Sequence, residues 1–178
     1  MGAGRRIFIG LVACVLLLQA AAGRAAAPSA PGPELASAGP TVAIVVNQAN
    51  PVQDLSFQEL RRIFLGERSH WPDGRRITLV MMEPGTAERK AMLRDVYRMS
   101  EPDLNRHFLR GLFTGEVFAS PKTLATSVGV RKFVFNVPGA IGYMSLADVD
   151  DSVKVIRVDG HLPSDKDYLF AVDSRPVK

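Results

Sequence analysis

The chain has very little cysteine and little histidine. Its only cysteine is Cys14, and its three histidines are His70, His107 and His161. A single thiol forms no intramolecular disulfide, so the hydrophobic core alone must stabilise the fold. The histidines lack the paired spacing of a metal site, and no Gly-x-Ser-x-Gly sequence is present. The sequence therefore indicates neither an enzyme nor a protein with a cofactor or a metal.

The chain also lacks an apolar run long enough to span a membrane. The longest such run is residues 7–18, whereas a helix needs about 20 residues to cross a bilayer. Arg5 and Arg6 precede this run, and small residues follow it. Such a pattern is typical of a secretory signal. We expect residues 1–25 to be a signal peptide, cleaved between Ala22 and Ala27, and the protein to work in the periplasm or outside the cell.

Three other interpretations of this segment remain open. The first is a permanent membrane anchor, for which the apolar run is short. The second is twin-arginine export, because Arg5 and Arg6 are adjacent. The third is a lipoprotein, because Leu11 to Cys14 resembles a lipobox, although the apolar run continues past Cys14 to Leu18. Ordinary cleavage stays the preferred prediction.

Charge is unevenly distributed along the chain. Residues 61–132 contain 14 Lys and Arg against 8 Asp and Glu, a net charge of +6, whereas residues 133–178 contain 5 against 7. A basic middle region attracts small anions, but solvated helix faces produce the same composition. Aromatic residues do not alternate with these charges, so nucleic acid is not an expected partner.

Proline, alanine, glycine and serine dominate residues 26–40, which we expect to form a tether before a single domain over residues 41–178. Within this domain, apolar runs and helix-start signals alternate. Alternation of this kind predicts an α/β fold, a three-layer α/β/α single domain. We expect strands at 42–46, 77–82, 140–144 and 153–158, and helices that start at Ser56, Thr86 (to about Arg98), Ser100 and Ser120 (to about Phe135).

The turn Pro84-Gly85-Thr86 lies between the second expected strand and the next helix. Free backbone N–H groups at a helix start, together with the helix dipole, favour an anion. The Thr86 hydroxyl could add a donor. An ordinary strand-to-helix turn with a capping threonine fits the same residues.

Several short sequences occur in an order that resembles a known family. They are Val45-Val46-Asn47, Ile63-Phe64-Leu65-Gly66 followed by Trp71, and Gly139-Ala140-Ile141-Gly142-Tyr143. This order, over residues 42–158, is similar to the phosphate-binding proteins of ABC uptake systems, which have the type 2 periplasmic binding protein fold. In particular, the chain resembles a short member that corresponds to one lobe of the two-lobed proteins.

The resemblance implies a non-enzymatic periplasmic protein that binds phosphate or another small oxyanion for uptake. The family has an arginine after the second strand and Ser-Gly-Thr at the helix start. Here that arginine is missing, and Pro84 takes the place of the serine. The candidate anion-binding residues are therefore Gly85, Thr86 and Arg89, the last as a possible replacement one turn into the helix.

Two alternatives stand beside this hypothesis. One is a ligand-free interaction module whose partner is a membrane transporter or another periplasmic protein. It predicts an exposed apolar patch near the helix that carries Phe108 and Phe113. The other is a secreted enzyme, which would need an acid pair assembled by the fold, for example from Asp148, Asp150 and Asp151.

Overall fold

The computed structural model describes residues 41–170. The predicted signal peptide, residues 1–25, and the tether, residues 26–40, lie outside this range and stay predictions. Within residues 41–170, no helix combines the length and the apolar character that a membrane span requires.

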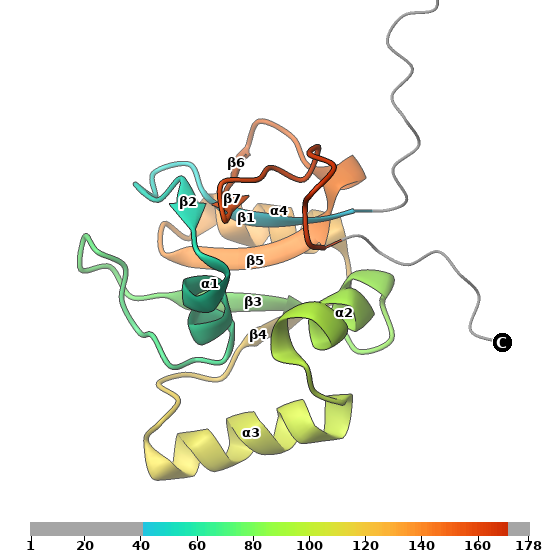
Figure 1. The fold of residues 1–178 in the computed structure, drawn as a ribbon. Helices are drawn as coiled ribbons and strands as arrows, with labels where there is room; N and C mark the ends of the chain where they lie inside the picture. The colour runs from blue at the N-terminus through green and yellow to red at the C-terminus, as the bar shows by residue number, and fades with distance from the viewer. Residues whose placement is uncertain (1–40, 171–178) are drawn as a thin grey trace, which may run out of the picture. The chain divides into compact units, whose positions relative to one another are not determined.

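A five-stranded mixed sheet forms the centre of the described domain (Figure 1). β3 pairs in parallel with β4 and β5, whereas β1 pairs antiparallel with β5 and β6. β1 is buried along its whole length, as expected for a continuous apolar run in a central strand. In spatial order the strands are β4 (Lys122–Leu124), β3 (Thr78–Met82), β5 (Ala140–Ser145), β1 (Val42–Asn47) and β6 (Val153–Val155).

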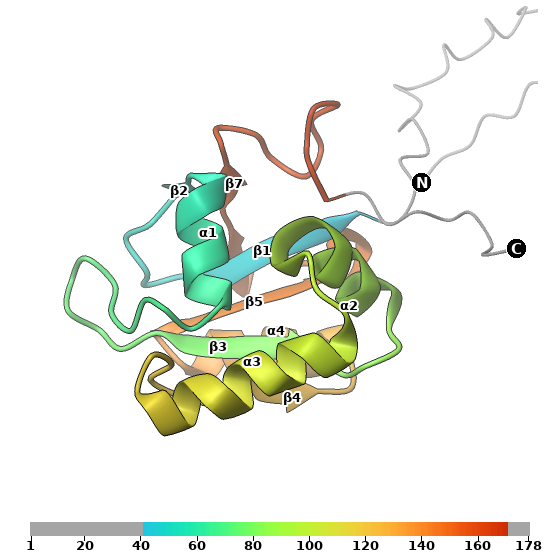
Figure 2. The ribbon, with the colours of Figure 1, turned by 60° about the horizontal axis from the view of Figure 1, so that its bottom comes forward.

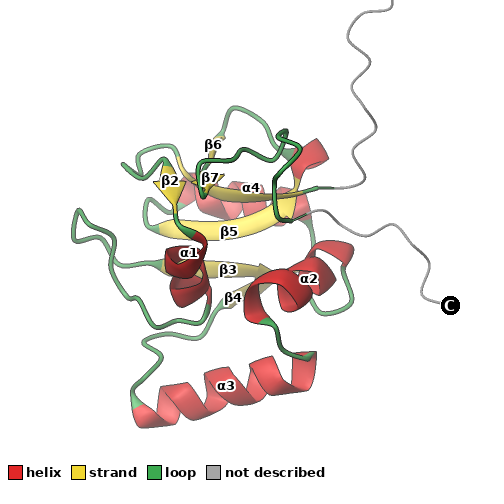
Figure 3. Ribbon diagram, viewed as in Figure 1, coloured by secondary structure: helices red, strands yellow, loops and turns green. Residues whose placement is uncertain are grey.

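Helices cover both faces of this sheet (Figures 1 and 2). α4 (Ser127–Asn136) packs on one face against β1, β3 and β5, and α1 (Phe57–Phe64) and α2 (Ala87–Met92) cover the other. This arrangement confirms the predicted α/β/α layers. α3 (Glu101–Thr114) lies beyond the edge strand β4, as Figure 3 shows in red. The remaining elements are the π-helix η1 (Leu93–Tyr97), the 3-10 helix η2 (Leu146–Asp148) and the parallel pair β2 (Asp54–Leu55) and β7 (Arg157–Val158).

Three predicted helix starts are confirmed by their capping hydrogen bonds. The hydroxyls of Ser56, Thr86 and Ser100 each accept a hydrogen bond from the backbone N–H three residues further on. At Ser56 the carboxylate of Glu59 also accepts from the backbone N–H of Ser56, which completes a capping box. These short-range signals need no tertiary context, so the sequence alone could reveal them.

The helix predicted from Ser120 is wrong. Residues 122–124 form β4 instead, and α4 begins only at Ser127, after the N-cap Thr126. β4 is stabilised by parallel pairing with Val80 to Met82 of β3, a long-range contact that outweighs the local Ser-Pro signal.

Two other expected elements are interrupted. The strand expected over residues 153–158 breaks at Ile156, whose N–H donates to the carbonyl of Ile44, and the chain continues as β7 beside β2. The helix expected over residues 86–98 changes from α2 to the π-helix η1 and ends at Arg98, which has a left-handed backbone.

Gly142 of β5 lies close to both α4 and β3. A Cβ atom at this position would lie 3.1 Å from Val130 Cγ1 and 3.2 Å from Val80 Cβ. The close approach expected for a glycine inside this strand is therefore confirmed. Gly142 lets the helix layer and the sheet pack without a gap.

We expect Gly142→Ala to lower the free energy of unfolding by about 1–3 kcal/mol, because the added methyl group has no free space. Urea denaturation followed by circular dichroism measures this change. Ala147→Val, at an exposed position of η2, is the control and should change the free energy of unfolding by less than about 0.5 kcal/mol. Equal stability of the two variants would contradict the tight packing.

Candidate functional site

The turn between β3 and α2 carries the predicted residues Gly85 and Thr86. Gly85 has φ +93°, and open space surrounds the position of a Cβ atom there. The Thr86 hydroxyl donates to the carbonyl of Glu83 (3.0 Å) and accepts from the N–H of Arg89 (3.3 Å). That hydroxyl is therefore engaged within the turn, and the turn offers a ligand mainly the backbone N–H groups of the first helical turn.

Arg89, the third predicted residue, points into the protein. Its side chain is 3% exposed and forms a bidentate ion pair with Glu101 at the start of α3. Nη2 lies 2.6 Å from Glu101 Oε1 and Nε lies 3.1 Å from Oε2. Burial opposes the charged form, but the bonds to Glu101 and the contact with Tyr143 outweigh it and raise the pKa of Arg89. Its positive charge is thus already balanced within the fold.

A groove of about 270 Å³ between the β3–α2 turn and α3 contains this ion pair. Pro84 of the turn, Arg89 and Glu101 all line it, and Leu109 and Leu112 of α3 form an apolar side. The structure therefore brings Arg89 to the same groove as the turn, with the Glu101 carboxylate bound to its guanidinium. The role of Gly85, Thr86 and Arg89 in binding an anion stays a prediction.

Glu101→Gln should lower the free energy of unfolding by about 2 kcal/mol, because it leaves the buried guanidinium of Arg89 without a counter-charge. The figure lies below the usual loss for a fully buried pair because a quarter of the Glu101 side chain is exposed. Urea denaturation measures it. Glu88→Gln on α2 removes the same charge from a residue that has no ion pair within residues 41–170, and it should lower the free energy of unfolding by less than about 0.5 kcal/mol. If Glu101→Gln lowered the free energy of unfolding as little as Glu88→Gln does, the ion pair between Arg89 and Glu101 would contribute little to stability.

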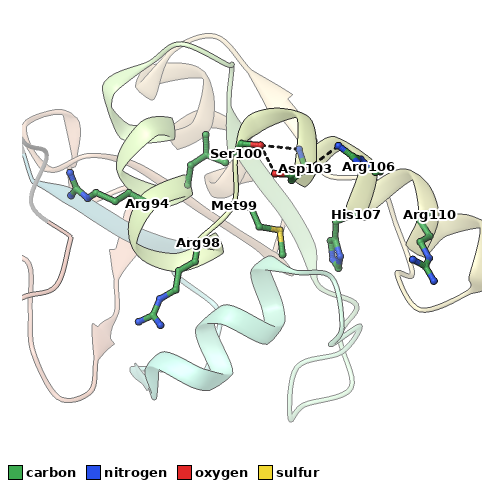
Figure 4. Close-up of a pocket in the computed structure, with 9 residues that line it drawn as sticks. Arg94, Arg98, Met99, Ser100, Asp103, Arg106, His107 and Arg110 are labelled. Atoms are coloured by element: carbon green, nitrogen blue, oxygen red, sulfur yellow. Dashed lines mark hydrogen bonds and ion pairs between the residues drawn. The ribbon is translucent and has the colours of Figure 1, made fainter. Parts of the chain in front are cut away.

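A second, wider groove of about 560 Å³ lies between η1 and α3 (Figure 4). We call it the arginine groove. Much of its lining is basic, and it collects part of the positive charge of residues 61–132. The sequence showed this charge but not its location in the fold. Two pairs of arginines, Arg94 with Arg98 and Arg106 with Arg110, are each four residues apart, and this spacing could have indicated a shared surface. The lining residues are Leu93, Arg94, Arg98, Met99, Ser100, Asp103, Arg106, His107 and Arg110.

Two of these arginines form ion pairs and two do not. Arg94 binds Asp95 (2.6 Å, Nε to Oδ1), and Arg106 binds Asp103 (3.1 Å, Nη2 to Oδ1). Arg98 lies over the ring of Phe57, 5.9 Å from its centroid. Among residues 41–170, neither Arg98 nor Arg110 forms an ion pair, and both side chains are exposed.

An exposed apolar patch lies on α3 and the loop that follows. Phe113 is 85% exposed and Leu109 60%, while Leu112 and Phe118 are less exposed. We call these four residues the α3 patch. The patch predicted for an interaction module is therefore present around Phe113, whereas Phe108 is buried.

The remaining candidate residues contact other parts of the described domain. Residues 41–170 contain no cluster of His, Cys, Asp or Glu that could hold a metal ion. The exposed carboxylate of Asp150 forms an ion pair with Arg131 (3.1 Å), and hydrogen bonds from Ser152 lower its pKa. His107 bonds through Nε2 to the carbonyl of Leu65 (2.9 Å) and thereby attaches α3 to the end of α1. These contacts stabilise the fold.

No protein-family model matches the chain. Among curated proteins, it is 30% identical over 126 residues to the phosphate-binding protein PstS of Bacillus subtilis (strain 168), covering 70% of this chain and 38% of that protein.

Solved structures show the same similarity. A protein from Clostridium perfringens, described as a phosphate ABC transporter substrate-binding protein with bound phosphate, has a TM-score of 0.58 and 25% identity, over 70% of this chain and 47% of that one. An ABC-type phosphate transport receptor from Vibrio cholerae has a TM-score of 0.57 and 24% identity, over 70% and 48%.

Phosphate appears in the names of all three relatives, and the chain spans less than half of the length of each. The predicted resemblance is confirmed over most of the described domain. In fold and sequence, the chain resembles one part of the substrate-binding proteins of phosphate ABC transporters.

Proposed function

We propose that this chain is an exported, non-enzymatic solute-binding protein that holds phosphate or another small oxyanion at the β3–α2 turn, as part of ABC-type uptake. The observation that carries the proposal is the open turn at Gly85, just before α2, where the position of a Cβ atom has no atom beyond those of its chain neighbours within 4 Å. The similarity to phosphate-binding proteins supports the choice of ligand. A periplasmic location follows from the same proposal and from the predicted signal peptide.

The charges around the turn indicate weak binding. Glu83 is exposed, Glu88 is partly exposed, and Glu101 balances Arg89. A phosphate ion at the turn would therefore gain hydrogen bonds from backbone N–H groups to a charged acceptor, worth about 1.5–3 kcal/mol each, without a free arginine. We expect a dissociation constant of about 10–1000 μM.

Titration calorimetry of the exported chain with phosphate tests this proposal, and sulfate is titrated for comparison. Gly85→Asp should abolish binding, because the new carboxylate repels the anion and the backbone at φ +93° disfavours a side chain. Gly74→Asp is a matched control, since Gly74 also has a positive φ (+81°) in open space, and this variant should bind normally. Absence of heat with millimolar phosphate, or equal binding by both variants, would contradict a site at the turn.

A second candidate function is favoured by the α3 patch. Side chains as large as Phe113 rarely remain exposed together with apolar neighbours unless they meet a partner. In this hypothesis the fold of a binding protein serves as an interaction module for a periplasmic protein or a membrane transporter.

A photo-crosslinking amino acid in place of Phe113 should yield a covalent product with the partner in living cells. The same amino acid in place of Phe135, an exposed phenylalanine (55%) on α4, should yield none. Immunoblotting of the cell envelope fraction detects the products. Similar products from both positions, or none from either, would count against an interface at the α3 patch.

A further inference from the structure

The arginine groove and the β3–α2 turn have no lining residue in common. We propose that the arginine groove binds a ligand with several phosphoryl groups arranged along its length, such as a short linear polyphosphate. This inference takes only the ligand chemistry, phosphate, from the proposed function.

The first argument is the location of uncompensated positive charge. Arg98 and Arg110 are exposed, and neither is in an ion pair among residues 41–170. By contrast, Arg89 at the turn is bound to Glu101, and Glu83 and Glu88 add negative charge there. A ligand with several negative charges therefore gains more electrostatic energy in the arginine groove than at the turn.

The second argument is the spacing of these charges. Figure 4 shows Arg98 toward one end of the groove and Arg110 toward the other, with Met99 and His107 between them. A chain of phosphoryl groups reaches further along this lining than a single phosphate ion does, so we expect each additional group to add electrostatic attraction.

The third argument concerns the kind of anion. The planar guanidinium fork matches the oxygen atoms of a phosphoryl group with two parallel hydrogen bonds. Among the described residues, no tryptophan, tyrosine or phenylalanine lines the groove, so they offer no aromatic surface on which nucleic acid bases could stack. The groove therefore suits phosphoryl groups that carry no base. They could belong to a soluble polyphosphate or to the headgroups of an anionic membrane.

The test is calorimetric titration of the exported chain with sodium tripolyphosphate and with orthophosphate. We expect tripolyphosphate to bind at least about tenfold more tightly than orthophosphate, and Arg98→Gln/Arg110→Gln to weaken its binding about tenfold or more. The control Arg157→Gln/Lys166→Gln removes two exposed positive charges outside the groove and should change the affinity less than about twofold. A second arm measures co-sedimentation with phosphatidylglycerol-containing vesicles.

The outcomes separate the possibilities. Loss of tripolyphosphate binding in the groove variant alone supports a soluble ligand, and loss of vesicle binding in that variant alone supports a membrane headgroup. Equal losses in the control variant, or no binding in either arm, would overturn the proposal. If the double variant is unstable, the single variant Arg110→Gln replaces it, because Arg110 is exposed and its substitution should also weaken tripolyphosphate binding. Gly85 does not line the arginine groove, so Gly85→Asp tests only the proposed site at the turn. The proposals for the turn and for the groove can therefore fail independently.

Discussion

The ion pair between Arg89 and Glu101 is the interaction on which both grooves depend. It joins α2 to the start of α3, a helix that lies beyond the edge of the sheet. The hydrogen bond from His107 to the carbonyl of Leu65 fixes the same helix to the end of α1. Together they hold α3 as a wall shared by the narrow groove at the turn and by the arginine groove, and they leave the α3 patch facing outward.

This ion pair also determines where a negative ligand gains energy. A buried guanidinium needs a counter-charge, and Glu101 supplies it from within the chain. Arg98, just after η1, and Arg110 of α3 are exposed and have no such requirement, so their charge is available to a ligand. The narrow groove therefore offers mainly backbone donors, whereas the arginine groove offers free cations. The similarity to phosphate-binding proteins covers less than half of their length, so their site does not transfer directly to this chain.

The short-range signals in the sequence predicted much of the fold. Ser56, Thr86 and Ser100 marked helix starts because a cap needs only a hydroxyl and a backbone N–H three residues away. The buried strands followed from continuous apolar runs. The helix-start signal at Ser120 gave a wrong prediction, because residues 122–124 pair with β3 and form a strand. Pairing of this kind depends on a strand about 40 residues earlier, which no local pattern shows.

The sequence by itself determined the layered α/β class, the family resemblance and the presence of a strand-to-helix turn at Gly85, because each depends on neighbouring residues or on their order. The tertiary structure alone decided the environment of each charge. It paired Arg89 with Glu101, twelve residues away, and it gathered Arg98 and Arg110 on one groove. The physical reason is that a side chain's charge acts through the atoms that surround it in space, and these come from elements separated along the chain.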